Sequence, residues 1–129
     1  MQEENSIQTR KQVAVQFLQL TAAGHIDEAY QKYANMRGKH HNPFFPASFQ
    51  ELQRALIENH ARFPDKQLTI KHVLGDGDMV AVHSHILLFP GDTGISAVHI
   101  FRFQDYKIVE IWDCNQPVPA DSPNKDGAF

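Results

Sequence analysis

The sequence is poor in cysteine, in positive charge and in long hydrophobic runs. Its one cysteine, Cys114, excludes a disulfide within the chain and any zinc site built from several thiolates. Lys and Arg number 12 against 15 Asp and Glu, so the net charge of -3 offers no basic surface for nucleic acid or an anionic membrane. No run reaches the roughly 18 apolar residues of a membrane-spanning helix, and the polar N-terminus does not resemble a secretory signal. We therefore expect a cytoplasmic protein with neither nucleic acid nor membrane as a partner.

Histidine, by contrast, is abundant, with eight among 129 residues. The length and a hydrophobic fraction of 42% predict a single domain, residues 1–129, with a core of its own. Ionisable side chains are costly to bury unless they are paired or line a cavity. The histidines are therefore the first candidates for a functional site.

The hydrophobic pattern changes its period near the middle of the chain. Apolar residues recur at helical spacing in three segments before Pro64, whereas apolar and polar residues alternate after it. Turn signals at Gly75–Asp78 and Pro90–Gly94 divide the second half into strands. The segment Gly38–Pro46, with a glycine and two prolines, is expected to be a loop. We predict an α+β domain in which three N-terminal helices pack on a curved, antiparallel four-strand sheet and enclose a pocket, with an extended tail from about residue 117.

Alternation along the strands assigns the histidines of the sheet to faces. Successive residues point to opposite sides, so His83 and His85 share one side of their strand. We expect pairing with the next strand to bring His85 close to His99. A last hairpin closed by a three-residue loop or a bulge would set His99 opposite Asp113, and this is the closure that the turn residues favour. A strict two-residue turn would place Trp112 there instead.

The predicted register gives the sheet two different faces. One face would gather ionisable groups among apolar ones, as a ligand pocket does. It is expected to hold His72, His83, His85, His99, Asp113 and Asn115 among Phe101, Phe103, Ile111 and Leu87. The other face would be nearly as apolar as a core, with Val80, Val82, Ile86, Leu88, Val98, Ile100, Ile108 and Trp112. An exposed apolar face of that size predicts a homodimer formed through the outer side of the sheet.

Several segments resemble a known family. The sequence His41–Pro43 (HNP), and Ile100–Phe103 followed by Lys107–Asp113 (KIVEIWD), resemble the SnoaL-like polyketide cyclase branch of the NTF2-like superfamily. The segment Gln116–Pro119 is similar to the ending of a subgroup described as predicted SnoaL-like aldol-condensation enzymes. The resemblance covers nearly the whole chain. It implies an NTF2-like cone of three helices and a curved sheet around a deep pocket, which commonly dimerises through the sheet.

The resemblance also implies roles for two residues. Polyketide-cyclase members use an aspartate on the last strand as general base, with a histidine beside it on the preceding strand, and Asp113 and His99 match these by position. Burial in a water-poor pocket would raise the pKa of such a carboxylate towards neutrality. We therefore expect acid/base chemistry without a cofactor or metal on a small carbonyl compound: aldol cyclisation, isomerisation or dehydration. The expected site residues are Asp113 and His99 as the catalytic pair, and His41, His83, His85, Phe101 and Asn115 in contact with the substrate.

Two other functions stay open at this point. Gly77 and His83–His85 match the start of a cupin metal motif, and His99 and Asp113 would complete a site for a divalent ion. The order of helices before strands argues against a cupin. NTF2-like domains also include binding and dimeric interaction modules without catalysis. An open pocket beside Asp113 and His99 would favour an enzyme, and a filled interior would favour an interaction module.

Overall fold

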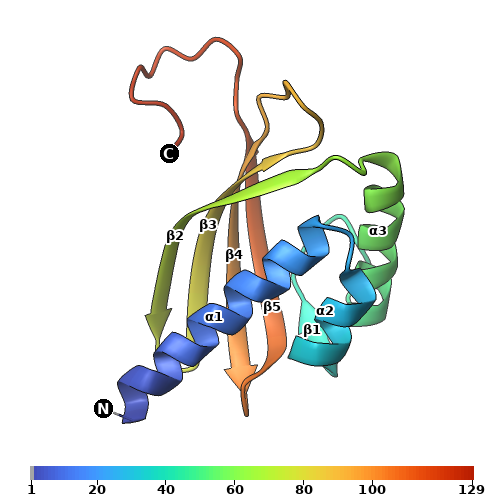
Figure 1. Cartoon of the computed structure of the whole chain (residues 1–129), viewed down its shortest axis with the longest axis vertical. Coiled ribbons are helices and arrows are strands. Elements are labelled where there is room, and N and C mark those ends of the chain that lie inside the picture. Colours follow the sequence, from blue (N-terminus) through green and yellow to red (C-terminus); the bar gives the residue numbers. More distant parts are fainter. Residues whose placement is uncertain (1) are drawn as a thin grey trace.

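The computed structural model describes residues 2–129, with side chains from residue 6 onward. All three helices lie on one face of a single sheet, and the long first helix crosses it diagonally (Figure 1). The helices are α1 (Gln2–Ala22), α2 (Ile26–Tyr33) and α3 (Phe49–Arg62). The strands are β1 (Ala34–His40), β2 (Gln67–Asp76), β3 (Met79–Leu87), β4 (Ile95–Gln104) and β5 (Lys107–Pro117). Among the described residues, no helix is both long and apolar enough to cross a membrane.

The sheet has five strands and is mixed, so the prediction of four antiparallel strands is wrong. Strands β2 to β5 form the expected antiparallel meander, but β1 joins its far edge parallel to β5, in the order β1-β5-β4-β3-β2. The sheet is open, with β1 and β2 at its edges. The last three residues of β1, Gly38–His40, fall in the segment Gly38–Pro46 that we expected to be a loop. Its sequence, ANMRGKH, has no β-branched residue, and its extended form depends on pairing with a distant strand.

Helix α3 begins and ends where its sequence predicts. Ser48 is its N-cap, and the Ser48 hydroxyl accepts a hydrogen bond from the backbone N–H of Glu51 at 3.1 Å. Pro64 follows the last turn and cannot continue the helix. Because both ends are determined locally, the face of α3 that carries Leu52 and Leu56 is held against the sheet.

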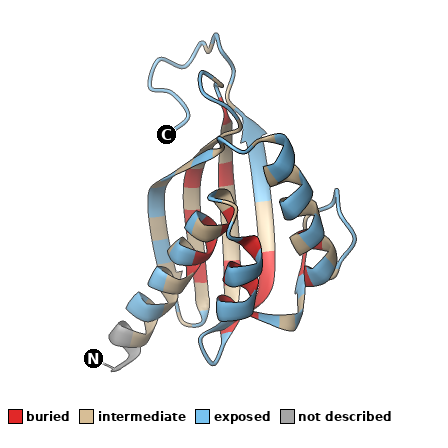
Figure 2. Cartoon of the chain, turned by 45° about the vertical axis from the view of Figure 1, so that its right-hand side comes forward, coloured by how far each residue is buried: buried red, intermediate tan, exposed pale blue. Residues whose placement is uncertain are grey.

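The core lies between the helices and the inner face of the sheet, where Figure 2 shows the buried positions gathered on the middle strands. Phe17 packs edge-on against Tyr30 and against Phe101, with ring centroids 5.1 and 5.9 Å apart. Tyr30 in turn meets Phe49 edge-on at 5.9 Å. Phe101 is 0% exposed, so it lies inside this aromatic core.

Strands β3 and β4 pair three residues out of step with the prediction. The prediction set His85 beside His99, but Val82 pairs with His99 and His83 pairs with Val98. A shift by an odd number of residues exchanges the faces of a strand, so His83 and His85 point to the outer side while His99 points inward. The prediction that these three histidines share a face is therefore wrong.

The loop between β3 and β4 explains the shift. The last pair of the two strands is Ile86 with Ile95, and the intervening chain folds back on itself through Asp92. Its carboxylate accepts from the backbone N–H of Leu88 at 3.0 Å, and its own N–H donates to the carbonyl of Phe89 at 3.1 Å. This loop is longer than the turn that the Pro90–Gly94 signal indicated.

The same shift makes the outer face less apolar than predicted. Four residues assigned to it instead lie inward, in the core or the cavity described below: Val80, Val82, Ile86 and Leu88. Ile108 on β5 also lies inward, because the pairing of β4 with β5 shifts between Arg102 and Phe103. The residues that stay on the outer face are Val98, Ile100 and Trp112, which pair with His83, Ala81 and other outward positions. Phe129, from the tail after β5, packs against the rings of His83 and His85 on this side.

A β-bulge determines the register of the last hairpin. Asp105 and Tyr106 both adopt positive φ, and the strands close tightly around this two-residue turn. Taken alone, that turn would misalign His99 with Asp113, but the pairing shifts between Arg102 and Phe103. The shift restores the alignment, so the predicted pairing of His99 with Asp113 is confirmed.

Candidate functional site

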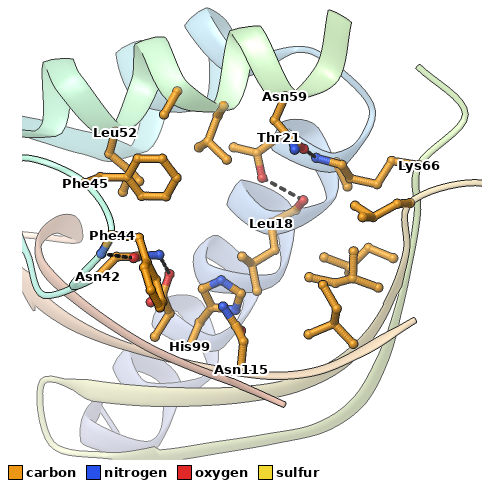
Figure 3. A pocket seen from close by; sticks show the side chains of 18 residues that line it. Leu18, Thr21, Asn42, Phe44, Phe45, Leu52, Asn59, Lys66, His99 and Asn115 are labelled. Atoms are coloured by element: carbon orange, nitrogen blue, oxygen red, sulfur yellow. Dashed lines mark hydrogen bonds between the residues drawn. The ribbon is translucent and has the colours of Figure 1, made fainter. Parts of the chain in front are cut away.

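A cavity of about 400 Å³ lies between helices α1 and α3 and the inner face of the sheet (Figure 3). Most of its wall is apolar, from side chains such as Leu18, Leu56, Leu68 and Ile86. Polar side chains gather in two places. Asn42, His99, Asp113 and Asn115 form the first group, and Asn59 and Lys66 the second. The two groups lie on opposite sides of the cavity in Figure 3.

Asp113 is the one carboxylate among the described residues that line the cavity. It is half-buried on β5, and its Oδ2 accepts a hydrogen bond from Asn42 Nδ2 at 3.0 Å. His99 lies beside it on β4 as its directly paired residue. No hydrogen bond joins the two side chains among the described residues, so Asn42, and not His99, holds the carboxylate.

Asn42 is held in turn by its own loop. Its Oδ1 accepts from the backbone N–H of Phe44 at 2.9 Å, in an Asx turn. Its backbone N–H donates to Nδ1 of His40 at 3.1 Å, and the other nitrogen of that ring bonds the carbonyl of Pro46. Because Oδ1 is occupied, the amide NH₂ points at Asp113. The sequence did not predict Asn42 as a site residue, although it lies within the HNP segment, because its position depends on the folded loop.

His99 is arranged to stay neutral. Its Nδ1 is buried and has no hydrogen-bond partner in the described part of the chain, and the centroid of its ring lies 6.1 Å from that of Phe101. Burial lowers the pKa of His99 below its usual value, and the charge of Asp113 only partly opposes this. A neutral imidazole forms no ion pair with the charged carboxylate of Asp113. Asp113 can therefore accept a proton without breaking an ion pair with His99.

The other predicted substrate contacts do not line the cavity, apart from Asn115, which lies at its exposed rim. His41 points outward: its Nε2–H donates to Glu110 Oε2 at 2.6 Å, and its ring stacks on Trp112 at 5.0 Å. Consecutive residues of extended chain point to opposite sides, so Asn42 faces the cavity and His41 cannot. The hydrogen bond from His41, aided by Arg102, lowers the pKa of Glu110.

The remaining two histidines make their contacts on the outer face. Nδ1 of His83 lies 3.0 Å from Nδ1 of His72, and its Nε2 lies 2.9 Å from the hydroxyl oxygen of Ser96. Nε2 of His85 donates a hydrogen bond to the carbonyl of Thr93 at 2.9 Å. The sheet separates both from His99, so the metal site considered from the sequence is not assembled. Among the described residues, no group of three or more His, Cys, Asp or Glu is placed to hold a metal ion.

Comparison with known families identifies the domain. Residues 14–111 match the family model described as the SnoaL-like domain. The chain belongs to this family. Comparison with proteins of curated function finds no match.

Solved structures similar to this SnoaL-like domain share its fold at low sequence identity. An NTF2-like protein of unknown function from Burkholderia xenovorans is 18% identical, with a TM-score of 0.71 over 90% of this chain and 88% of that one. A "putative ketosteroid isomerase" from Kribbella flavida is 17% identical, with a TM-score of 0.71 over 93% and 87%. A "putative polyketide cyclase" from Acidithiobacillus ferrooxidans is 21% identical, with a TM-score of 0.66 over 84% and 88%. The fold is therefore the α+β NTF2-like fold, here with three helices and an open, mixed sheet of five strands.

The SnoaL-like domain also places a buried phenol near its carboxylate. The hydroxyl of Tyr30, on α2, has no hydrogen-bond partner among the described residues and almost no exposed surface. Burial, and then the negative charge of Asp113, raise the pKa of Tyr30 above its usual range. The phenol therefore stays protonated and neutral.

The lowered pKa of His99 predicts that the SnoaL-like domain loses stability in mild acid. Above about pH 6.5 the ring is neutral in both states, but below it the unfolded chain binds the proton first. The free energy of unfolding should thus fall as the pH falls below about 6.5. Urea unfolding of wild type and His99→Gln at about pH 7 and pH 5 measures this. The variant should lose less stability, and an equal loss in both proteins would contradict the prediction.

Proposed function

We propose that this SnoaL-like domain is an enzyme that removes a proton next to the carbonyl group of a small, largely apolar substrate, with Asp113 as the base and no cofactor. One observation carries the proposal: a single carboxylate lies in an open apolar cavity, oriented by Asn42 and beside a neutral His99. A carboxylate in such surroundings can take a proton from a carbon atom, because it is neither fully hydrated nor paired with a cation.

The chemistry balances with the residues at hand. Asp113 takes the proton from the carbon, and the electron pair of the C–H bond moves into an enolate whose charge rests on the carbonyl oxygen. Neutral donors that border the cavity, namely the ring of His99 and the amide of Asn115, can stabilise that oxygen. The enolate then attacks a second carbonyl carbon, takes a proton at another carbon, or expels the hydroxyl group of the next carbon. In each case the protonated Asp113 gives its proton back, to the new alkoxide, to the carbon or to the departing hydroxide, so the base is regenerated. These outcomes are aldol cyclisation, isomerisation and dehydration.

Two structural neighbours have names that fit this chemistry, one as a polyketide cyclase and one as a ketosteroid isomerase. Both reactions begin with loss of a proton next to a carbonyl group. At 21% and 17% identity these neighbours share the fold with this chain, and its own cavity supports the chemistry. Of the substrate contacts predicted from the sequence, Asn115 is the one that borders the cavity, at its exposed rim.

Deuterium exchange tests the proposal without knowledge of the final product. Wild-type protein is incubated in D₂O with a panel of apolar cyclic and aliphatic ketones, and NMR follows loss of the proton signals next to each carbonyl. We expect exchange above the buffer rate for at least one ketone. If ligand-observed NMR detects binding of one or more ketones, but no ketone in the panel exchanges faster than in buffer, the domain would instead be a binding module.

We also propose that two copies associate through the outer face of the sheet, around Val98, Ile100 and Trp112. These side chains are partly exposed and lie next to one another on paired strands. Light scattering after gel filtration should give twice the mass of one chain. Ile100→Lys should give a single chain, because a buried unpaired charge is costly. A wild-type protein that runs as one chain at all concentrations would contradict the proposal.

A further inference from the structure

Lys66 lies in the wall of the cavity without a counter-ion. It is half-buried just before β2, and it is the one lysine or arginine among the described lining residues. Its ammonium group donates a hydrogen bond to Oδ1 of Asn59, on the last turn of α3. No ion pair joins it to a carboxylate in the described part of the chain. A half-buried cation with only a neutral partner is incompletely compensated.

The cavity is therefore polarised. Asn42 and His99 lie on one side, Lys66 and Asn59 lie on the other, and Leu18 lies between them (Figure 3). Asp113, which accepts a hydrogen bond from Asn42, belongs to the first side. Burial lowers the pKa of Lys66, which is what an amine among apolar neighbours without a counter-charge should show. An anionic ligand group placed beside Lys66 would supply the missing charge, whereas the same group beside Asp113 would be repelled.

We propose that Lys66 binds a carboxylate group of the substrate, so that the substrate is an oxo acid. Its carboxylate would lie at Lys66 and Asn59, and its carbonyl group at Asp113. Its apolar carbon chain would lie along the apolar wall of the cavity between these two ends. This rests on the proposed function, because the carbonyl end is placed by Asp113 acting as the base. Lys66 then determines both specificity and orientation, since the two charged ends of the cavity allow an acid to enter in one direction only. A neutral ketone of the same length lacks this anchor.

Binding of simple acids tests the anchor separately from catalysis. The probes are straight-chain carboxylates from butanoate to octanoate, with the primary amide of each acid as its neutral match. NMR titration of the protein gives Kd for each. Wild type should bind the best carboxylate about ten- to a hundredfold more tightly than its amide, as expected for a hydrogen bond to a charged group. Equal binding of acid and amide, or no binding of either, would overturn the proposal.

Variants of Lys66 separate charge from shape. Lys66→Met keeps most of the apolar stem and should remove the preference for the carboxylate while leaving amide binding within about twofold. Lys66→Arg keeps the charge and should retain most of the preference. Should the Met variant fail to unfold cooperatively, Lys66→Gln takes its place. A Lys66→Met protein that loses acid and amide binding equally would show that Lys66 only ties β2 to α3.

Asp113→Asn distinguishes this inference from the proposed function. That variant should bind the carboxylates at least as well as wild type, because a repelling charge is gone. If the acids bind through Lys66 but no ketone or oxo acid exchanges its protons, the anchor stands and the proposed chemistry fails. If ketones exchange but acids show no preference, the chemistry stands and the anchor fails.

Discussion

Replacing Asp113 with asparagine is expected to slow proton exchange next to the substrate carbonyl by about 10²- to 10⁴-fold. Asparagine has the shape of aspartate, and its side-chain oxygen can still accept the hydrogen bond from Asn42 that holds Asp113 at 3.0 Å. It has no basic oxygen, so it cannot take the proton from carbon. The change therefore removes the chemistry while it leaves the cavity wall intact. Exchange rates in D₂O, measured at saturating ketone, report the effect directly.

The matched control is Asp121→Asn, the same substitution at an exposed position of the tail. It should leave the exchange rate unchanged. Both variants should unfold in urea within about 0.5 kcal/mol of wild type, as is usual for substitutions that create neither a cavity nor an unpaired charge. A folded Asp113→Asn protein with the wild-type exchange rate would remove Asp113 from the role of base.

Local signals in the sequence predicted those parts of the fold that local interactions determine. The three helices follow from apolar periodicity, and α3 ends before Pro64 as expected. The antiparallel meander follows from alternation and turn residues. Strand β1 was missed because its extended form depends on β5, more than sixty residues away in the sequence. A strand without β-branched residues, in a segment that carries a glycine, gives no local sign of that pairing.

The site was predicted only in part, because several of its contacts also depend on long-range pairing. Asp113 and His99 were correctly paired, but that pairing depends on a bulge that compensates a tight turn. His83 was placed on the wrong face because the loop through Asp92 is longer than its turn signal suggested, and a shift by an odd number of residues reverses every side chain. Asn42 reaches Asp113 through a loop held by hydrogen bonds to its own backbone. Contacts of that kind depend on the complete fold and leave no periodic pattern.

Phe101 gives the second large effect, and it acts on stability. Phe101→Ala is expected to lower the free energy of unfolding by about 3 to 5 kcal/mol, the usual cost of removing a buried phenyl ring. The side chain is 0% exposed, its ring meets that of Phe17 at 5.9 Å, and it lies 6.5 Å from that of Phe103. Its neighbours come from both α1 and β4, so the layers cannot close over the space it leaves. Urea unfolding at neutral pH measures the loss.

Phe44→Ala is the matched control because it removes the same ring from the rim of the cavity. Phe44 is 87% exposed, so its loss should change the free energy of unfolding by no more than about 0.5 kcal/mol. It borders the cavity, however, whereas Phe101 does not. Ligand binding should therefore weaken in Phe44→Ala at unchanged stability, and Phe101→Leu, which refills most of the space, should bind as wild type does. A Phe101→Ala protein of normal stability that binds ligand poorly would restore Phe101 to the substrate contacts that the sequence predicted.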